Sequence, residues 1–443
     1  MIRRFRSIAI FLVTATFAGT MHLAAQPNAL SAAPAQPFTA QQVQDLLQRL
    51  AQAEARIQSL ESKLTPQASA TAPAAVPSPN VPPEAHAAEP ADPTNAMPPT
   101  TGMLAAMMDH SAHDAAMPMG PSLQIRGFGD FTYAASNLRG TTNSFTLGQL
   151  DLFMSSKLSE HWNFVAESVI QGDKTTNTFG FEIERLMITY HLNDYLNAAF
   201  GRYHQKIGYY NTAYHHGTYF QTSVGRPFIF EFEDGGGILP IHNVGVSLYG
   251  KVPSGKLGLH WVAEVGNGRT SNSPNAEFVQ NVFDENNRKS VNIALFARPE
   301  WVEGLEVGGS VLKDRLYPTG FSRMNQTVSS AYVAYDRSGM EILNEVVIVG
   351  NDMLDAHRNF HNSGFYSQVS HKYKMVRPFV RYEYLNVNDH DPIFGSVGRR
   401  SGPLAGVRFE VGEFSAFKVQ YGRTFRSGFG TANSLTGQIA FAF

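Results

Sequence analysis

Most of the chain after residue 122 consists of long stretches in which apolar and polar residues alternate. Sixteen such stretches can be distinguished, most of them about 11 to 15 residues long. Alternation is the pattern of extended strands, whose successive side chains point to opposite faces. Strands of soluble proteins usually have about 5 or 6 residues, whereas a tilted strand that crosses a bilayer needs about 9 to 11. The strand length therefore favours a sheet that spans a membrane.

The connections between these stretches alternate in length. The predicted strands span residues 123–136, 144–158, 163–173, 180–192, 196–211, 242–253, 257–268, 290–301, 305–318, 326–338, 340–353, 361–374, 376–389, 399–412, 415–427 and 433–443. Nearly every even-numbered connection is a short turn, whereas the odd-numbered ones are longer and two are very long, 212–241 and 269–289. Short turns at one end and long loops at the other are typical of bacterial outer-membrane barrels.

The two faces of the strands differ in the way that such a barrel requires. In the last strand Leu435, Ile439 and Phe441 share one face and Gln438 lies on the other. No water is available inside hydrocarbon to hydrogen-bond the backbone, so a membrane-spanning sheet has to close on itself. We therefore expect an all-β fold, a 16-stranded antiparallel transmembrane β-barrel over residues 122–443. A large soluble β-sandwich, the alternative, explains neither the strand length nor the loop asymmetry.

One predicted strand breaks the alternation. In 180–192, Arg185 falls in phase with Phe181 and Ile183. A charged side chain facing lipid at mid-depth costs roughly 2 to 4 kcal/mol. We therefore expect a bulge or a shifted register in this strand.

The N-terminus has the layout of a secretory signal peptide over residues 1–25. Arg3, Arg4 and Arg6 precede an apolar stretch that is too short for a spanning helix, and Ala24 and Ala25 follow. A retained membrane anchor is the alternative. The chain has no cysteine, which excludes disulfides and thiolate metal sites. A formal net charge of -2 gives no signal for nucleic acid.

Residues 39–64 carry a heptad pattern. The a and d positions are filled without a break by Val43, Leu46, Leu50, Ala53, Ile57, Leu60 and Leu64. This predicts a short coiled coil in the periplasm, since a helix of this length is marginal in water without a partner. A single amphipathic helix lying on a surface is the alternative.

Residues 65–121 form a predicted linker, rich in Pro and Ala and then in Met and His. Its composition cannot bury enough apolar area to fold. The candidate metal ligands near its end are Met107, Met108, His110, His113, Met117 and Met119. Thioethers suit Cu(I) and imidazoles suit Cu(II) or Zn(II). MMDHSAHDAAMPM resembles the Met/His-rich stretches of periplasmic copper-handling proteins; a linker of biased composition without a ligand is the other interpretation.

The signal peptide, coiled coil, Pro-rich linker, sixteen strands and terminal Phe443 together resemble outer-membrane porins. The most similar are the trimeric DcaP-like porins with an N-terminal coiled coil and the phosphate-selective porin family. NAAFGRYHQKIGYYN (197–211) is similar to a strand ending of the latter, whose dense Arg/Lys ladder is not found here. The resemblance implies a homotrimer in the outer-membrane lipid that passes small hydrophilic solutes. It also implies that Phe443 is read by the barrel-assembly machinery.

A constriction is expected where the connection 212–241 follows the fifth strand. The resemblance suggests that it folds inward, with Glu231, Glu233 and Asp234 facing basic residues on the wall. The wall candidates are Arg202, His204, Lys206, Arg298, Arg381, Arg408 and Lys418. Acids predicted to share the lumen are Asp151, Glu167, Glu264, Glu383 and Glu410. The slight basic excess predicts a weak anion preference; solvated loop charges and cross-strand pairs are the alternative.

No motif in the chain indicates an enzyme or a cofactor. A barrel phospholipase needs a Ser and a His that converge at the lipid face, and His361, Asn362 and Ser363 are the nearest match. Neighbours on a strand point to opposite faces, which argues against that trio. We expect a channel without enzymatic activity or cofactor. A barrel that handles copper or another metal through its Met/His-rich segment is the alternative.

Overall fold

The computed structural model describes residues 121–173, 177–214, 217–232, 235–270, 282–318 and 321–443. The predicted signal peptide, coiled coil and Met/His-rich segment lie outside the described residues. So do the loop acids Glu233 and Asp234. The predictions on these segments stay predictions.

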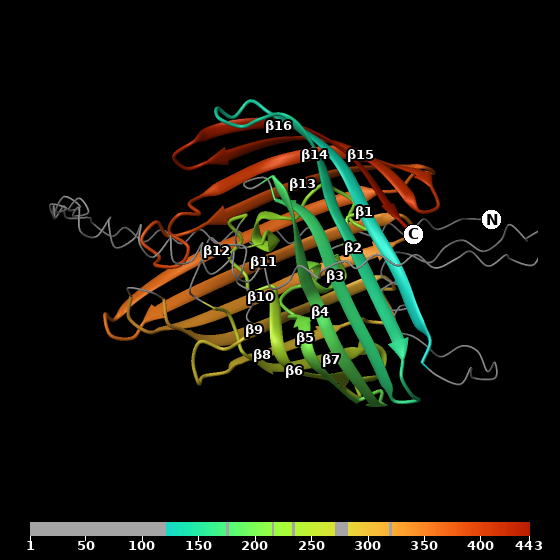
Figure 1. The fold of residues 1–443 in the computed structure, drawn as a ribbon, viewed down its shortest axis with the longest axis vertical. Helices are drawn as coiled ribbons and strands as arrows, with labels where there is room; N and C mark the ends of the chain where they lie inside the picture. Colours follow the sequence, from blue (N-terminus) through green and yellow to red (C-terminus); the bar gives the residue numbers. More distant parts are fainter. Residues whose placement is uncertain (1–120, 174–176, 215–216, 233–234, 271–281, 319–320) are drawn as a thin grey trace, which may run out of the picture. The chain divides into compact units, whose positions relative to one another are not determined.

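The described residues form one closed antiparallel barrel in which each strand pairs with its neighbours in the chain and β1 pairs with β16 (Figure 1). The strands are β1 (Leu123–Ser136), β2 (Ser144–Lys157), β3 (Trp162–Asp173), β4 (Thr178–Asn193), β5 (Leu196–His204), β6 (His242–Lys251), β7 (Leu259–Gly266), β8 (Ser290–Ala297), β9 (Leu305–Leu316), β10 (Met324–Arg337), β11 (Met340–Met353), β12 (Arg358–His371), β13 (Val376–Asn386), β14 (Arg400–Gly412), β15 (Ser415–Arg426) and β16 (Gly430–Ala442). The predicted fold class is confirmed.

The predicted boundaries hold to within a few residues, with one clear exception. Residues 196–211 were expected to form one strand, but β5 ends at His204. The chain then turns inward at Gly208, whose φ is 71°, and enters the short helix α3 (Tyr210–Ala213). The strand prediction is wrong here because an inner-wall carboxylate, that of Glu345, binds the backbone N–H groups of Tyr209 and Tyr210, as described below.

The expected irregularity in β4 is a bulge. Glu167 of β3 pairs with Arg185, and the next residue, Ser168, pairs with Ile183, which leaves Glu184 as the extra residue. The bulge reverses the phase of the strand, so that Arg185 Nε reaches Glu167 Oε2 at 2.5 Å. Phe181 and Ile183 stay on the outer face, where they are exposed.

The outer face of the barrel is apolar on all sides. The exposed side chains include Phe145, Phe181, Ile293, Ile348, Val380, Tyr421, Leu435, Ile439, Phe441 and Phe443. On β16 the inward-facing Gln438 and Ala440 are buried, as the alternation predicts. An apolar surface of this extent is costly in water and suits lipid. No helix among the described residues is long and apolar enough to cross a membrane.

The barrel closes at a seam of glycines and aromatic rings. Gly127 N donates to Phe443 O at 2.8 Å, and Phe443 N donates to Gly127 O at 2.9 Å. The Phe443 ring occupies the space that a Cβ at Gly127 would need, and the Phe441 ring does the same at Gly129. Rings packed over glycines on the neighbouring strand support the pairing of β1 with β16.

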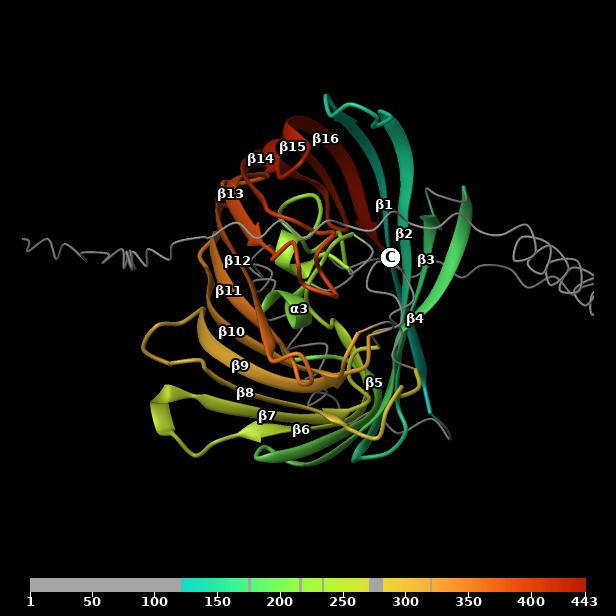
Figure 2. The same ribbon diagram turned by 90° about the vertical axis from the view of Figure 1, so that its left-hand side faces the viewer.

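The interior is filled unevenly. A cluster of buried apolar side chains covers the inner wall from β9 to β13, and its wall members include Leu312, Val328, Leu343, Tyr366 and Leu385. They pack against two connections inside the barrel, residues 205–241 after β5 and residues 387–399 after β13. Figure 2 shows the first connection, with α3, within the ring of strands.

Candidate functional site

The inward connection 205–241 is the candidate site, because a segment inside the lumen decides what can pass. Its short helical segments are α3 and η1 (Phe228–Phe230). Ile229, Phe230, Ile238 and Leu239 are all completely buried against the wall or the loop itself. Apolar burial therefore holds this part of the connection to the β9–β13 side of the barrel, while Tyr219 packs against Phe128, Ala416 and Ala440 on β1, β15 and β16.

Glu345 on β11 fixes the start of the connection. Its carboxylate accepts hydrogen bonds from Tyr209 N at 2.6 Å, Tyr210 N at 2.9 Å and Tyr366 Oη at 2.6 Å. The two backbone donors belong to the first turn of α3 and the residue before it. A buried carboxylate with three donors is a strong, geometrically specific anchor.

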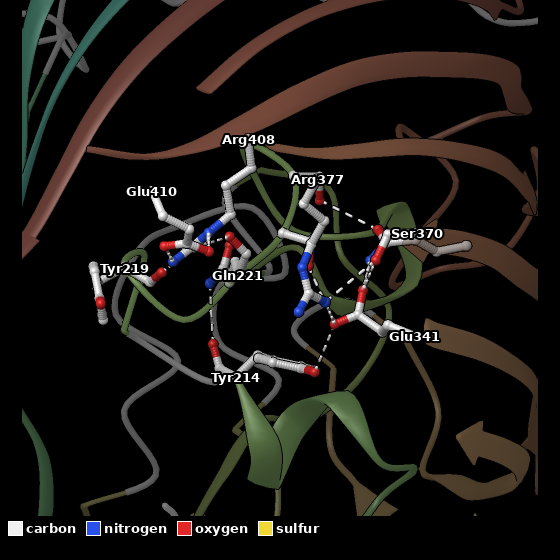
Figure 3. A network of polar contacts seen from close by, with 11 residues as sticks. Tyr214, Tyr219, Gln221, Glu341, Ser370, Arg377, Arg408 and Glu410 are labelled. Carbon is white, nitrogen blue, oxygen red and sulfur yellow. Dashed lines mark hydrogen bonds and ion pairs between the residues drawn. The ribbon is translucent and has the colours of Figure 1, made fainter. Parts of the chain in front are cut away.

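Glu341, four residues earlier on the same inner face, fixes the next part of the connection (Figure 3). It accepts from Tyr214 Oη at 3.2 Å and from Thr222 Oγ1 at 3.1 Å. Gln368 Nε2 on β12 and Arg377 Nη1 on β13 approach it at 2.8 Å and 3.6 Å. The two glutamates thus bind the connection at its start, at Tyr214 and at Thr222.

Three of the predicted wall cations bind the far part of the connection through its carbonyl and hydroxyl oxygens. Arg381 Nη1 donates to Ser223 Oγ at 2.7 Å. Arg408 Nη1 donates to Gln221 O at 3.0 Å and also to Tyr219 O, as Figure 3 shows. Lys418 Nζ donates to Thr218 O at 2.5 Å and is 0% exposed.

Two of these cations are paired with acids on their own strands. Arg381 Nε lies 2.7 Å from Glu383 Oε1, and Arg408 Nε lies 3.0 Å from Glu410 Oε1. Pairing with a carboxylate reduces the field that each of them exerts in the lumen. Arg381 and Arg408 therefore serve mainly to position the loop.

Arg400 is an anchor that the sequence reasoning missed. Its guanidinium donates to Glu231 Oε2 at 2.7 Å, Gly235 O at 3.3 Å and Gly236 O at 2.5 Å. It therefore meets the one predicted loop acid that the structure describes. Arg400 and Arg408 are an even number of residues apart on β14, so the sequence alone could have placed both on the inner face. The same holds for Glu341 and Glu345 on β11.

The other predicted wall residues lie in two separate groups. Lys206 is beyond the end of β5, where its Nζ lies 3.5 Å from Glu306 Oε1 and 4.8 Å from the Phe296 ring centre. Arg298 Nε donates to the same carboxylate at 2.8 Å. In the second group Arg202 Nε donates to Glu184 O at 3.2 Å, and His204 Nε2 lies 3.6 Å from Glu167. The predicted residues thus form no single ring.

Burial changes the protonation equilibria of the connection itself. It lowers the pKa of Lys206, while Glu306 acts in the opposite direction. It raises the pKa of Tyr214 well above its ordinary value and raises the pKa of Glu231, against the influence of Arg400. These shifts have a common cause, which is that the loop–wall interface is largely dehydrated.

The second inward connection, 387–399, is held by Asp391. Its Oδ2 accepts from Asn351 Nδ2 at 2.8 Å and Asn362 Nδ2 at 2.7 Å, while Oδ1 accepts from Ile393 N at 2.9 Å. Asn362 therefore faces the lumen as part of this anchor. Among the described residues, no group of three or more His, Asp or Glu side chains could hold a metal ion.

The opposite wall, formed by β16, β1 and β2, remains partly open. Thr132, Thr146 and Thr436 face inward and are partly exposed. Inward side chains of a closed barrel can be exposed only to the lumen. Their exposure therefore marks the side on which the lumen stays accessible, in contrast to the buried wall from β9 to β13.

Comparison with solved structures agrees with this architecture. The outer membrane channel DcaP of Acinetobacter baumannii superposes with a TM-score of 0.53 at 12% identity, over 74% of this chain and 99% of that one. The trimer form of OmpT of Vibrio cholerae gives a TM-score of 0.49 at 11% identity, over 73% of this chain and 100% of that one. OprB of Pseudomonas putida gives 0.48 at 10%, over 73% and 94%.

No protein-family model matches the chain, and no curated protein matches its sequence. At 12% identity the likeness to DcaP is one of fold. The protein therefore has the 16-stranded fold of an outer-membrane channel.

Proposed function

We propose that the protein is a porin of the bacterial outer membrane, through which small hydrophilic solutes diffuse passively. The observation that carries the proposal is a closed barrel with an apolar outer face and a connection anchored inside its lumen. A barrel of about 16 strands encloses an aqueous channel, and its selectivity depends on what narrows it. The connection 205–241 is the proposed constriction.

The constriction residues proposed from the sequence act, in this account, mainly through the position of the loop. Arg381, Arg408 and Lys418 bind loop carbonyls or hydroxyls, and Glu231 is held by Arg400. Arg202, His204, Lys206 and Arg298 belong to the adjoining wall. A weak anion preference was expected, but it receives little support from cations that are buried or paired with glutamates.

Assembly and partners belong to the same proposal. A homotrimer, a periplasmic coiled coil over 39–64 and recognition of Phe443 by the barrel-assembly machinery fit a porin. An enzymatic activity is not proposed. The copper-handling alternative depends on residues 107–119, and a peptide of residues 103–119 that fails to bind copper in a titration would remove it.

Swelling of liposomes measures the proposed activity directly. We expect vesicles that contain the folded, full-length mature protein to swell in isotonic solutions of small sugars, at rates that fall as solute size increases. Vesicles with the heat-unfolded protein are the control. Equal rates in both preparations would refute passive diffusion through the barrel.

A further inference from the structure

Asp130 on β1 lies on the open side of the lumen, where hydrogen bonds from the surrounding strands hold its carboxylate. Its carboxylate accepts from Thr132 Oγ1 at 3.0 Å, Gln149 N at 3.1 Å and Gln438 Nε2 at 3.1 Å. The side chain is partly exposed, and exposure inside the barrel means exposure to the lumen. Three donors from three strands hold the charge in one place.

A β-bulge on β2 makes this position possible. The pairing of β1 with β2 shifts between Gly129 and Phe131, so that Gly148 and Gln149 both lie opposite Asp130. The bulge turns the Gln149 N–H toward the carboxylate, and a Cβ at Gly148 would overlap the Asp130 oxygens. Bulges of this kind re-aim groups near functional sites.

Asp130 also faces the inward connection. Thr218 Oγ1 lies 3.4 Å from Asp130 Oδ1, at the point where the loop approaches the open wall. The loop therefore touches the wall at Asp130, and Tyr219 and Phe220 pack beside it against Phe128 and Ala440. The carboxylate lies at the edge of this contact, where it is still partly exposed.

Asp130 has no ion-pair partner within 4 Å among the described residues, whereas Glu306, Glu383 and Glu410 on the inner wall each have one. Asp130 and Lys418 interact electrostatically. However, the Lys418 ammonium is fully buried and points at Thr218 O and Ser223 O. A solute in the lumen thus meets the carboxylate and not the ammonium.

The partly exposed side chains around Asp130 are uncharged. Its neighbours Thr132, Thr146, Gln149 and Thr436 bear hydroxyl or amide groups and are partly exposed. The charged side chains that flank this stretch, Lys418 on β15 and Asp151 on β2, are buried. Among its partly exposed neighbours, Asp130 is consequently the group that presents a fixed negative charge to the open side of the lumen.

We propose that Asp130 is the specificity-determining residue of the channel and makes it prefer small cations to anions. This inference rests on the proposed channel function, and its sign is opposite to the anion preference expected from the sequence. One unit charge about 6 Å from a monovalent ion in water changes the local ion concentration by about twofold to fourfold. Because the charge enriches the cation and depletes the anion by the same factor, its loss should reduce the cation-to-anion permeability ratio by about fourfold to sixteenfold.

Reversal potentials in a KCl gradient across a planar bilayer test the proposal. The wild-type channel should prefer K⁺, and Asp130→Asn should bring the permeability ratio of K⁺ to Cl⁻ down by about fourfold to sixteenfold. Asp130→Glu keeps the charge and should keep the preference. Asp194→Asn removes an exposed acid in a short turn and should change nothing.

A second variant separates charge from loop positioning. Thr218→Val removes the contact between the loop and Asp130 without changing charge, so it should leave the sign of selectivity intact. An anion-selective wild type, or an Asp130→Asn channel with unchanged reversal potential, would overturn the inference while leaving the channel function in place. If the folded wild type conducts no current, the proposed function itself fails. If Asp130→Asn does not fold, the ion selectivity of the wild-type channel still tests the proposal: a preference for K⁺ supports it and a preference for Cl⁻ refutes it.

Discussion

Releasing the start of the inward connection should convert a fixed constriction into a fluctuating one. In Glu345→Ala the buried N–H groups of Tyr209 and Tyr210 both lose their acceptor. Each buried donor left without a partner costs about 1 to 3 kcal/mol, so the docked loop loses about 2 to 6 kcal/mol. Even the lower value raises the ratio of released to docked loop about 30-fold. The strands themselves keep their pairing, since Glu345 contributes only its side chain to the interior.

Two measurements report the release. Amide hydrogen exchange in the segment that contains Tyr209 and Tyr210 should accelerate by at least about tenfold, and single-channel currents should become noisier. Glu345→Gln, which retains one acceptor oxygen, should give a smaller effect. Glu303→Ala is the matched control, because Glu303 is an exposed turn residue that pairs with the exposed Arg337. Exchange rates in Glu345→Ala that equal those of the control would refute the anchoring role.

Two further predictions concern packing, and one concerns assembly. Gly127→Ala should lower the thermal stability of the folded barrel, measured by its heat-modifiable gel mobility, because the new methyl group displaces the Phe443 ring; Gly437→Ala, with open space at its Cβ, should not. Phe230→Ala should destabilise the docked loop by about 3 to 5 kcal/mol and increase current noise, whereas the exposed Phe429→Ala should be silent. Deletion of residues 39–64 should reduce the trimer fraction in chemical cross-linking; an unchanged fraction would show that the segment is not needed for association.

The barrel was predictable because its cause is local in the sequence. Alternation over long strands and the lengths of the connections are visible without any knowledge of contacts. The phase error at Arg185 predicted the bulge, because a charge in lipid is too costly to leave uncorrected. The apolar outer face of the last strand, with Leu435, Ile439 and Phe441, follows from the same alternation.

The interior was less predictable, because it depends on pairs of residues that are far apart in the chain. Parity placed Arg408 and Lys418 in the lumen, but it could not show that a loop nearly 200 residues away would cover them. The same limitation explains the wrong end of β5, where Glu345 binds the backbone from 135 or 136 residues further along. The sequence pattern therefore shows wall cations such as Arg408 and Lys418 without the loop oxygens that bind them.

Single-channel recording of the purified full-length mature protein in a planar bilayer tests the central claim most directly. The account predicts ohmic current steps from a folded, heat-modifiable barrel, with closures in groups of three for a trimer. A folded barrel that inserts into the bilayer and conducts no current would contradict the account.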